Sequence, residues 1–93
     1  MEDLLSEPQI GDYLTQISGW VRLGSEIRRE FKFKNFLQAM NFVNAVAEAA
    51  EKSNHHPDID IRWNTVVLRL STHSKGGLTE LDFKMAGTIN GLI

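Results

Sequence analysis

The chain has 93 residues, no cysteine, three histidines and a formal net charge of -2, with ten basic and twelve acidic side chains. This length fits one small domain without a deep enclosed cavity, and the missing cysteines exclude a disulfide scaffold and a cysteine nucleophile. The interspersed charges argue against a nucleic-acid-binding surface, no run of apolar residues could span a membrane, and the acidic start Met1-Glu2-Asp3 is unlike a signal peptide. We therefore expect a single cytoplasmic domain over residues 1–93.

A helix and a β-hairpin are predicted first. Ser6 and Gln9 form a capping box with Pro8 in the first turn, and this helix is expected to end near Gly19. Its apolar stripe comprises Ile10, Tyr13, Leu14 and Ile17. Strands are predicted over 20–23 and 26–33, joined by a type II′ turn at Gly24-Ser25. Residues Ile27, Phe31 and Phe33 alternate with Arg28, Glu30 and Lys32, while Arg29 puts a charge on the apolar face that the sequence does not place.

The longest predicted helix follows, and its end forms a corner that holds two histidines. Asn35 is the expected N-cap and Asn54 the left-handed C-cap, before Pro57 prevents further helix. The predicted apolar stripe comprises Phe36, Met40, Val43, Ala47 and Ala50. His55 and His56 therefore lie between this helix and the next strand.

A second hairpin and a last helix complete the prediction. Ile59, Ile61 and Trp63 share one face of the third strand, Asn64-Thr65 forms the turn, and Leu68 and Leu70 are buried in the fourth strand. His73 lies just after that strand. Thr79 and Asp82 form a capping box, with Leu78 and Phe83 at the positions of a hydrophobic staple. The last apolar stripe comprises Met85, Ala86, Ile89 and Leu92.

This order predicts a two-layer α+β fold. Two hairpins can join into one four-stranded antiparallel sheet covered on one face by the helices, giving β-β-α-β-β-α with an extra N-terminal helix. Such a sheet leaves open edges, which are often paired with another subunit. We therefore expect a homo-oligomer.

The histidines are the main candidates for chemistry. The sequence has no G-x-G-x-x-G, Walker, G-x-S-x-G or H-E-x-x-H motif, so the usual phosphate-binding loops and common hydrolase sites are missing. All three histidines fall at the ends of predicted elements, and imidazole can both take and give a proton near neutral pH. This pattern favours proton transfer over covalent catalysis.

Seven residues carry a resemblance to a known family, the pterin-4a-carbinolamine dehydratases, also known as dimerisation cofactors of a homeodomain transcription factor. They are Glu51, His55-His56-Pro57, Trp63, His73 and Asp82, separated by three, five, nine and eight residues. Similarity also extends from Gly19-Trp20 to the last helix, so it covers nearly the whole chain.

The resemblance implies removal of water from 4a-hydroxytetrahydropterin to give quinonoid dihydropterin, in tetrahydrobiopterin recycling. It implies that His55 and His73 are the acid and base, in an undecided order, and that His56 orients the substrate. It further implies a homodimer or homotetramer, with no metal and no cofactor.

The supporting residues each have a structural alternative. Asp82 either orients a histidine or only caps a helix, and Glu51 either supports the corner or is a solvated residue. Trp20 either borders the pterin or is structural, and Pro57 fixes the histidine corner. Trp63 is expected to pack in the core instead of stacking on the pterin.

Two other functions stay open at this point. One is a non-catalytic interaction role on the same fold. The other is a metal site built from His55, His56, His73 and Asp82, because imidazoles and a carboxylate can bind zinc or iron.

Overall fold

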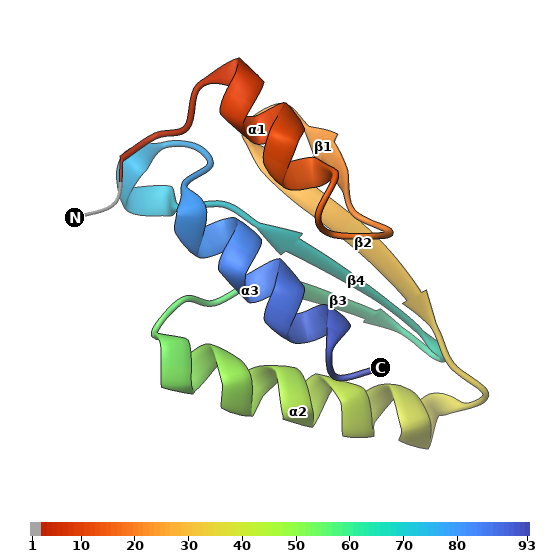
Figure 1. The fold of residues 1–93 in the computed structure, drawn as a ribbon. Coiled ribbons are helices and arrows are strands. Elements are labelled where there is room, and N and C mark those ends of the chain that lie inside the picture. Colours follow the sequence, from red (N-terminus) through yellow and green to blue (C-terminus); the bar gives the residue numbers. More distant parts are fainter. Residues whose placement is uncertain (1–2) are drawn as a thin grey trace.

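Each predicted hairpin has one apolar face, and the two hairpins join into one sheet whose apolar face is buried beneath the helices. The computed structural model describes residues 3–93 and shows a four-stranded antiparallel sheet of order β1-β2-β4-β3, covered on one face by three helices (Figure 1). The elements are α1 (Glu7–Leu14), β1 (Val21–Leu23), β2 (Glu26–Lys32), α2 (Phe36–Ser53), β3 (Asp58–Arg62), β4 (Thr65–Leu70), the 3-10 turn η1 (His73–Lys75) and α3 (Glu80–Asn90). The predicted α+β architecture is confirmed.

Two sequence-based expectations concern membranes and targeting. Within residues 3–93 no helix is long and apolar enough to cross a membrane. Met1 and Glu2, on which the expectation about a signal peptide partly rested, lie outside the described residues.

The alternation predicted for the central strands is confirmed. Ile27 of β2 and Leu70 of β4 are paired and fully buried beneath the helices. On the opposite face of the same pair of strands, Arg28 lies next to Arg69, and Arg69 forms an ion pair with Glu26. The sheet therefore has one dry face and one charged face, as an antiparallel sheet with a single helical layer requires.

The two hairpin turns differ in how well they were predicted. Gly24 has a φ of 61° and Leu23 pairs with Glu26, which fits the type II′ turn at Gly24-Ser25. The second turn is Trp63-Asn64 instead of Asn64-Thr65, because Arg62 pairs with Thr65. Trp63 is 68% exposed, with a φ of 52°, so the prediction that it packs in the core is wrong. The register puts it at the tip of the hairpin, beyond the last paired residues.

The helix boundaries and faces also differ in part from prediction. The capping box of Ser6 and Gln9 is present, but α1 ends at Leu14, and Ile17 is buried in the turn after it. The buried residues of α2 are Ala39, Phe42, Val43, Val46 and Ala50. The predicted stripe was thus right only at Val43 and Ala50, whereas Phe36 is 51% exposed and Ala47 is exposed. Leu92 lies beyond α3 and is exposed.

Aromatic packing explains which face of α2 turns inward. The ring of Phe42 lies 4.7 Å from that of Phe31 and 5.0 Å from that of Phe33, between centroids. Large rings dominate core burial, so Phe42 rotates its side of the helix toward β2 and turns Phe36 toward solvent.

An exposed ion pair connects α1 to β1. Arg22 donates from Nη2 to Oε2 of Glu7 at 2.9 Å, alongside a second hydrogen bond between the two side chains. This hydrogen bonding and the positive charge of Arg22 lower the pKa of Glu7, and the hydrogen bond to Glu7 raises the pKa of Arg22. Because solvent reaches the pair, its contribution to stability is small.

The charge of Arg29 is held between the chain before β1 and the end of α3. Its Nη1 donates to the carbonyl of Ser18 at 2.9 Å and to Oδ1 of Asn90 at 2.7 Å, and its guanidinium lies 4.6 Å from the centroid of the Phe31 ring. Gly19, with a φ of 88°, makes room for this arrangement, since a Cβ there would lie 2.6 Å from Nε of Arg29.

We expect Gly19→Ala to lower the free energy of unfolding by about 1–3 kcal/mol more than Gly24→Ala, because the added methyl must displace the Arg29 guanidinium. Gly24 is the matched control: it also has a positive φ, but a Cβ there meets nothing within 4 Å. Urea unfolding of both variants measures the difference. Equal losses of unfolding free energy in the two variants would show that the position of the Arg29 guanidinium does not depend on a glycine at position 19.

Candidate active site

The three histidines lie at the end of the sheet where α2 and β4 end and β3 and α3 begin. Asn54 closes α2 in the left-handed conformation, with φ 50° and ψ 41°, as predicted. His55 and His56 follow it, and the buried Pro57 leads directly into β3. His73 opens the short turn η1 after β4. The predicted histidine corner is therefore present.

His55 is paired with a buried carboxylate. Its Nε2 lies 2.6 Å from Oδ1 of Asp82, in the first turn of α3. The His55 side chain is 10% exposed and that of Asp82 is fully buried. A buried carboxylate must be matched by hydrogen-bond donors, and the contact with His55 is one place where a donor can meet it.

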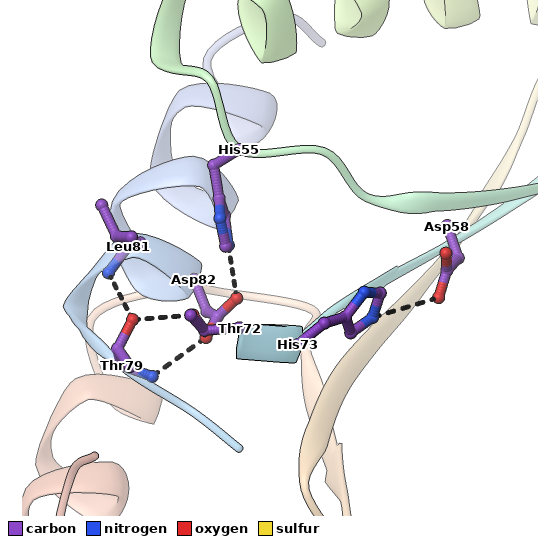
Figure 2. A network of polar contacts seen from close by, with 7 residues as sticks. All are labelled: His55, Asp58, Thr72, His73, Thr79, Leu81 and Asp82. Carbon is purple, nitrogen blue, oxygen red and sulfur yellow. Dashed lines mark hydrogen bonds and ion pairs between the residues drawn. The ribbon is translucent and has the colours of Figure 1, made fainter. Parts of the chain in front are cut away.

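Two threonines supply the other donors to Asp82. Its Oδ2 accepts from the hydroxyl of Thr72 and from the backbone amide of Thr79, both at 2.9 Å. The two threonine hydroxyls lie 2.8 Å apart, and Thr79 also accepts from the amide of Leu81 (Figure 2). Asp82 thus caps α3, as predicted, and in addition contacts His55.

The other two histidines face different carboxylates and are more exposed. Nε2 of His56 lies 2.6 Å from Oε2 of Glu51, in the last turns of α2. Nε2 of His73 lies 4.0 Å from Oδ2 of Asp58, and the His73 side chain is 71% exposed. Figure 2 shows His73 turned toward Asp58, whereas His55 points to Asp82. Glu51 is exposed, as the solvated alternative predicts, yet it contacts His56.

A cavity of about 310 Å³ opens beside His55 between the end of α2 and α3. It is lined by Ser53, His55, Leu81, Lys84, Met85 and Thr88. A second cavity, of about 320 Å³, shares Ser53 and Thr88 and continues along the two helices. His55 therefore has a buried partner on one side and accessible space on another.

Other predicted site residues are placed differently. Trp20 is buried and donates from Nε1 to Oδ1 of Asn90 at 2.8 Å. Asn90 ends α3, about 12 Å along the helix from Asp82 at 1.5 Å per residue. The predicted place of Trp20 at the border of a pterin site stays a prediction.

Two residues that contact the site were not predicted from the sequence, namely Thr72 and Asp58. Asp58 follows Pro57 directly, so its closeness to the corner was visible in the sequence, but its pairing with His73 needs the sheet register. Within residues 3–93 no group of three or more His, Cys, Asp or Glu side chains is arranged to hold a metal ion. Instead, each histidine lies near a different carboxylate: His55 near Asp82, His56 near Glu51 and His73 near Asp58.

Comparisons with known proteins agree on one family. A protein-family model described as Pterin 4 alpha carbinolamine dehydratase matches residues 3–92. A relative from Picosynechococcus sp., named "Putative pterin-4-alpha-carbinolamine dehydratase", is 46% identical over 92 residues, which is 99% of this chain and 100% of the relative. One of the same name from Koribacter versatilis is 47% identical over 90 residues, which is 97% of this chain and 96% of the relative.

Two solved structures are also similar. A transcriptional coactivator/pterin dehydratase from Brucella melitensis has a TM-score of 0.93 and 39% identity, over 97% of this chain and 98% of that one. A pterin dehydratase-like protein, described as a RuBisCO assembly factor in the alpha-carboxysome, has a TM-score of 0.64 and 22% identity, over 78% of this chain and 84% of that one. The second likeness shows the fold alone.

We expect Thr72→Val to lower the free energy of unfolding by about 1–3 kcal/mol, because it removes a donor from a buried carboxylate and an acceptor from Thr79. Thr72→Ser keeps the hydroxyl and is the matched control, with a smaller loss. Denaturant unfolding of both variants checks this. A valine variant as stable as the serine variant would mean that the hydroxyl does not stabilise Asp82.

Proposed function

This chain belongs to the pterin-4a-carbinolamine dehydratase family, and we propose that it removes water from a 4a-hydroxytetrahydropterin to give the quinonoid dihydropterin. The observation that carries the proposal is the pairing of His55 with the buried Asp82, beside a cavity and at the same end of the sheet as His73. We assign the reaction to tetrahydropterin recycling, as the resemblance implies. The cytoplasmic location and the single domain over residues 1–93 stay predictions.

The reaction needs one proton removed and one proton delivered. A base takes the proton from N5, and the electron pair of that bond forms the double bond between N5 and C4a. The bond from C4a to oxygen breaks, and the departing hydroxide takes a proton from an acid and leaves as water. The base has then gained the proton from N5 and the acid has lost its own proton to the leaving water, so proton exchange with solvent restores both groups.

The three histidines are the side chains able to take and give these protons. In the proposal, His55 and His73 are the acid and base, and His56 binds and orients the substrate. Glu51 supports His56 through the contact between their side chains. Asp82 orients His55, and Pro57 fixes the corner from which both neighbouring histidines project.

We expect His55→Ala and His73→Ala each to lower kcat for dehydration of a 4a-hydroxytetrahydropterin by about 10²-fold or more, since each removes a proton-transfer group. A stopped-flow absorbance assay measures the rate, with circular dichroism to confirm folding. Lys75→Ala is the control, because Lys75 is an exposed residue in the same turn as His73. Its rate should match the unsubstituted protein.

Unchanged rates in both histidine variants would overturn the assignment of His55 and His73 as the acid and base.

The second candidate function is an interaction role, favoured by the description of the Brucella relative as a transcriptional coactivator as well as a pterin dehydratase. That role alone would give no dehydration above background, together with a specific protein complex that survives both histidine substitutions.

We also propose that the chain forms a homodimer or homotetramer. The outer strands β1 and β3 leave their edges open, and several large apolar side chains are exposed. They include Val21 and Leu23 on β1 and Phe36 and Leu37 on α2. Open edges and apolar surface of this kind favour association between copies.

Sedimentation equilibrium at micromolar concentration should give a mass of two or four chains of 10.5 kDa. Leu23→Lys tests the contribution of β1, since a charge on an edge strand opposes strand pairing. A monomer at all concentrations in the unsubstituted protein would contradict this proposal, without bearing on the chemistry of the histidines.

A further inference from the structure

The hydrogen bonds around Asp82 define where the protons lie. The amide of Leu81 donates to Oγ1 of Thr79, and the amide of Thr79 donates to Oδ2 of Asp82. The single proton of the Thr72 hydroxyl is directed at Oδ2 of Asp82. The contact between the two threonine hydroxyls must then use the proton of Thr79, with Thr72 as the acceptor.

This arrangement leaves no place for a proton on Oδ2 of Asp82, because two donors already converge on that oxygen. Only Oδ1 remains, and it faces Nε2 of His55 at 2.6 Å. A single proton lies between them. Imidazole nitrogen is a stronger base than carboxylate oxygen, so the proton belongs to Nε2.

The other ring nitrogen of His55 has a different environment. No side chain or backbone group within residues 3–93 forms a hydrogen bond with Nδ1. Among the described residues, no buried side-chain nitrogen or oxygen lacks a hydrogen-bond partner. Nδ1 must therefore be accessible from outside the protein, and His55 is one of the residues that line the cavity between α2 and α3.

We propose that Asp82, held by Thr72 and Thr79, fixes neutral His55 in the Nε2–H tautomer, so that Nδ1 is the atom that exchanges a proton with the substrate. Asp82 is thus a positioning residue, and the two threonines act through it. The role of Nδ1 in catalysis rests on the proposed function, whereas the tautomer is a property of the protein without substrate.

The same geometry defines what Asp82→Asn does. Oδ2 receives two donors, so the amide oxygen of the asparagine must take that place. Its NH₂ group then takes the place of Oδ1 and points at Nε2 of His55. Two donors cannot face each other, so Nε2 becomes an acceptor and the proton moves to Nδ1. His55 can then no longer accept a proton at the accessible nitrogen.

Nitrogen-15 NMR of histidine-labelled protein tests this, because one-bond and two-bond couplings distinguish the two neutral tautomers. At a pH where the rings are neutral, we expect the Nε2–H form of His55 in the unsubstituted protein and the Nδ1–H form in Asp82→Asn. Glu80→Gln is the matched control: it removes one negative charge from the same turn of α3, and Glu80 contacts Tyr13. It should leave both the tautomer and kcat unchanged.

We expect kcat to fall by about 10²-fold or more in Asp82→Asn, together with the change of tautomer. The inference is overturned by an Nδ1–H tautomer in the unsubstituted protein, a measurement that stands even if the variant does not fold. It is also overturned if folded Asp82→Asn keeps the Nε2–H form. A protein with the expected tautomer but no dehydratase activity would refute the proposed function and leave the positioning intact.

Discussion

The burial of one carboxylate organises the end of the sheet where the three histidines lie. Asp82 has no exposed surface, and its charge is compatible with the interior only because donors reach it from three directions. They come from His55 after α2, Thr72 after β4 and Thr79 at the start of α3. His55 lies 27 residues before Asp82, whereas Thr72 and Thr79 lie only ten and three residues before it, so the contacts to the charge also fix the end of α2 against the start of α3.

The opposite end of α3 is held in a comparable way. Asn90 accepts from Trp20 and Arg29 and donates to the carbonyl of Ser18. The helix is thus fastened at both ends by polar contacts and along its length by buried apolar residues, which makes it a fixed support for Asp82. Such a support is what an acid–base site needs, because proton transfer depends on hydrogen-bond geometry.

Contacts between residues close in the sequence were predicted, whereas contacts between distant residues were not. The caps at Ser6, Asn35 and Thr79 involve neighbours three residues away, and they were predicted correctly. Trp63 was misplaced because a shift of one residue in the turn moves it from the sheet to the tip. The histidine corner was predicted from Pro57 and the αL cap. A contact of Asp82 with a histidine was only one of two alternatives, and the sequence did not say which histidine, because His55 and Asp82 are 27 residues apart.

Because Trp63 lies at an exposed turn, the two tryptophans of the chain respond differently to a soluble fluorescence quencher. The chain has two tryptophans, one 68% exposed at the tip of the second hairpin and the other, Trp20, only 5% exposed in the core. A soluble quencher such as iodide reaches the first indole and is shielded from the second. Intrinsic fluorescence therefore contains an accessible and a protected component, and the protected one reports the integrity of the core without any added label.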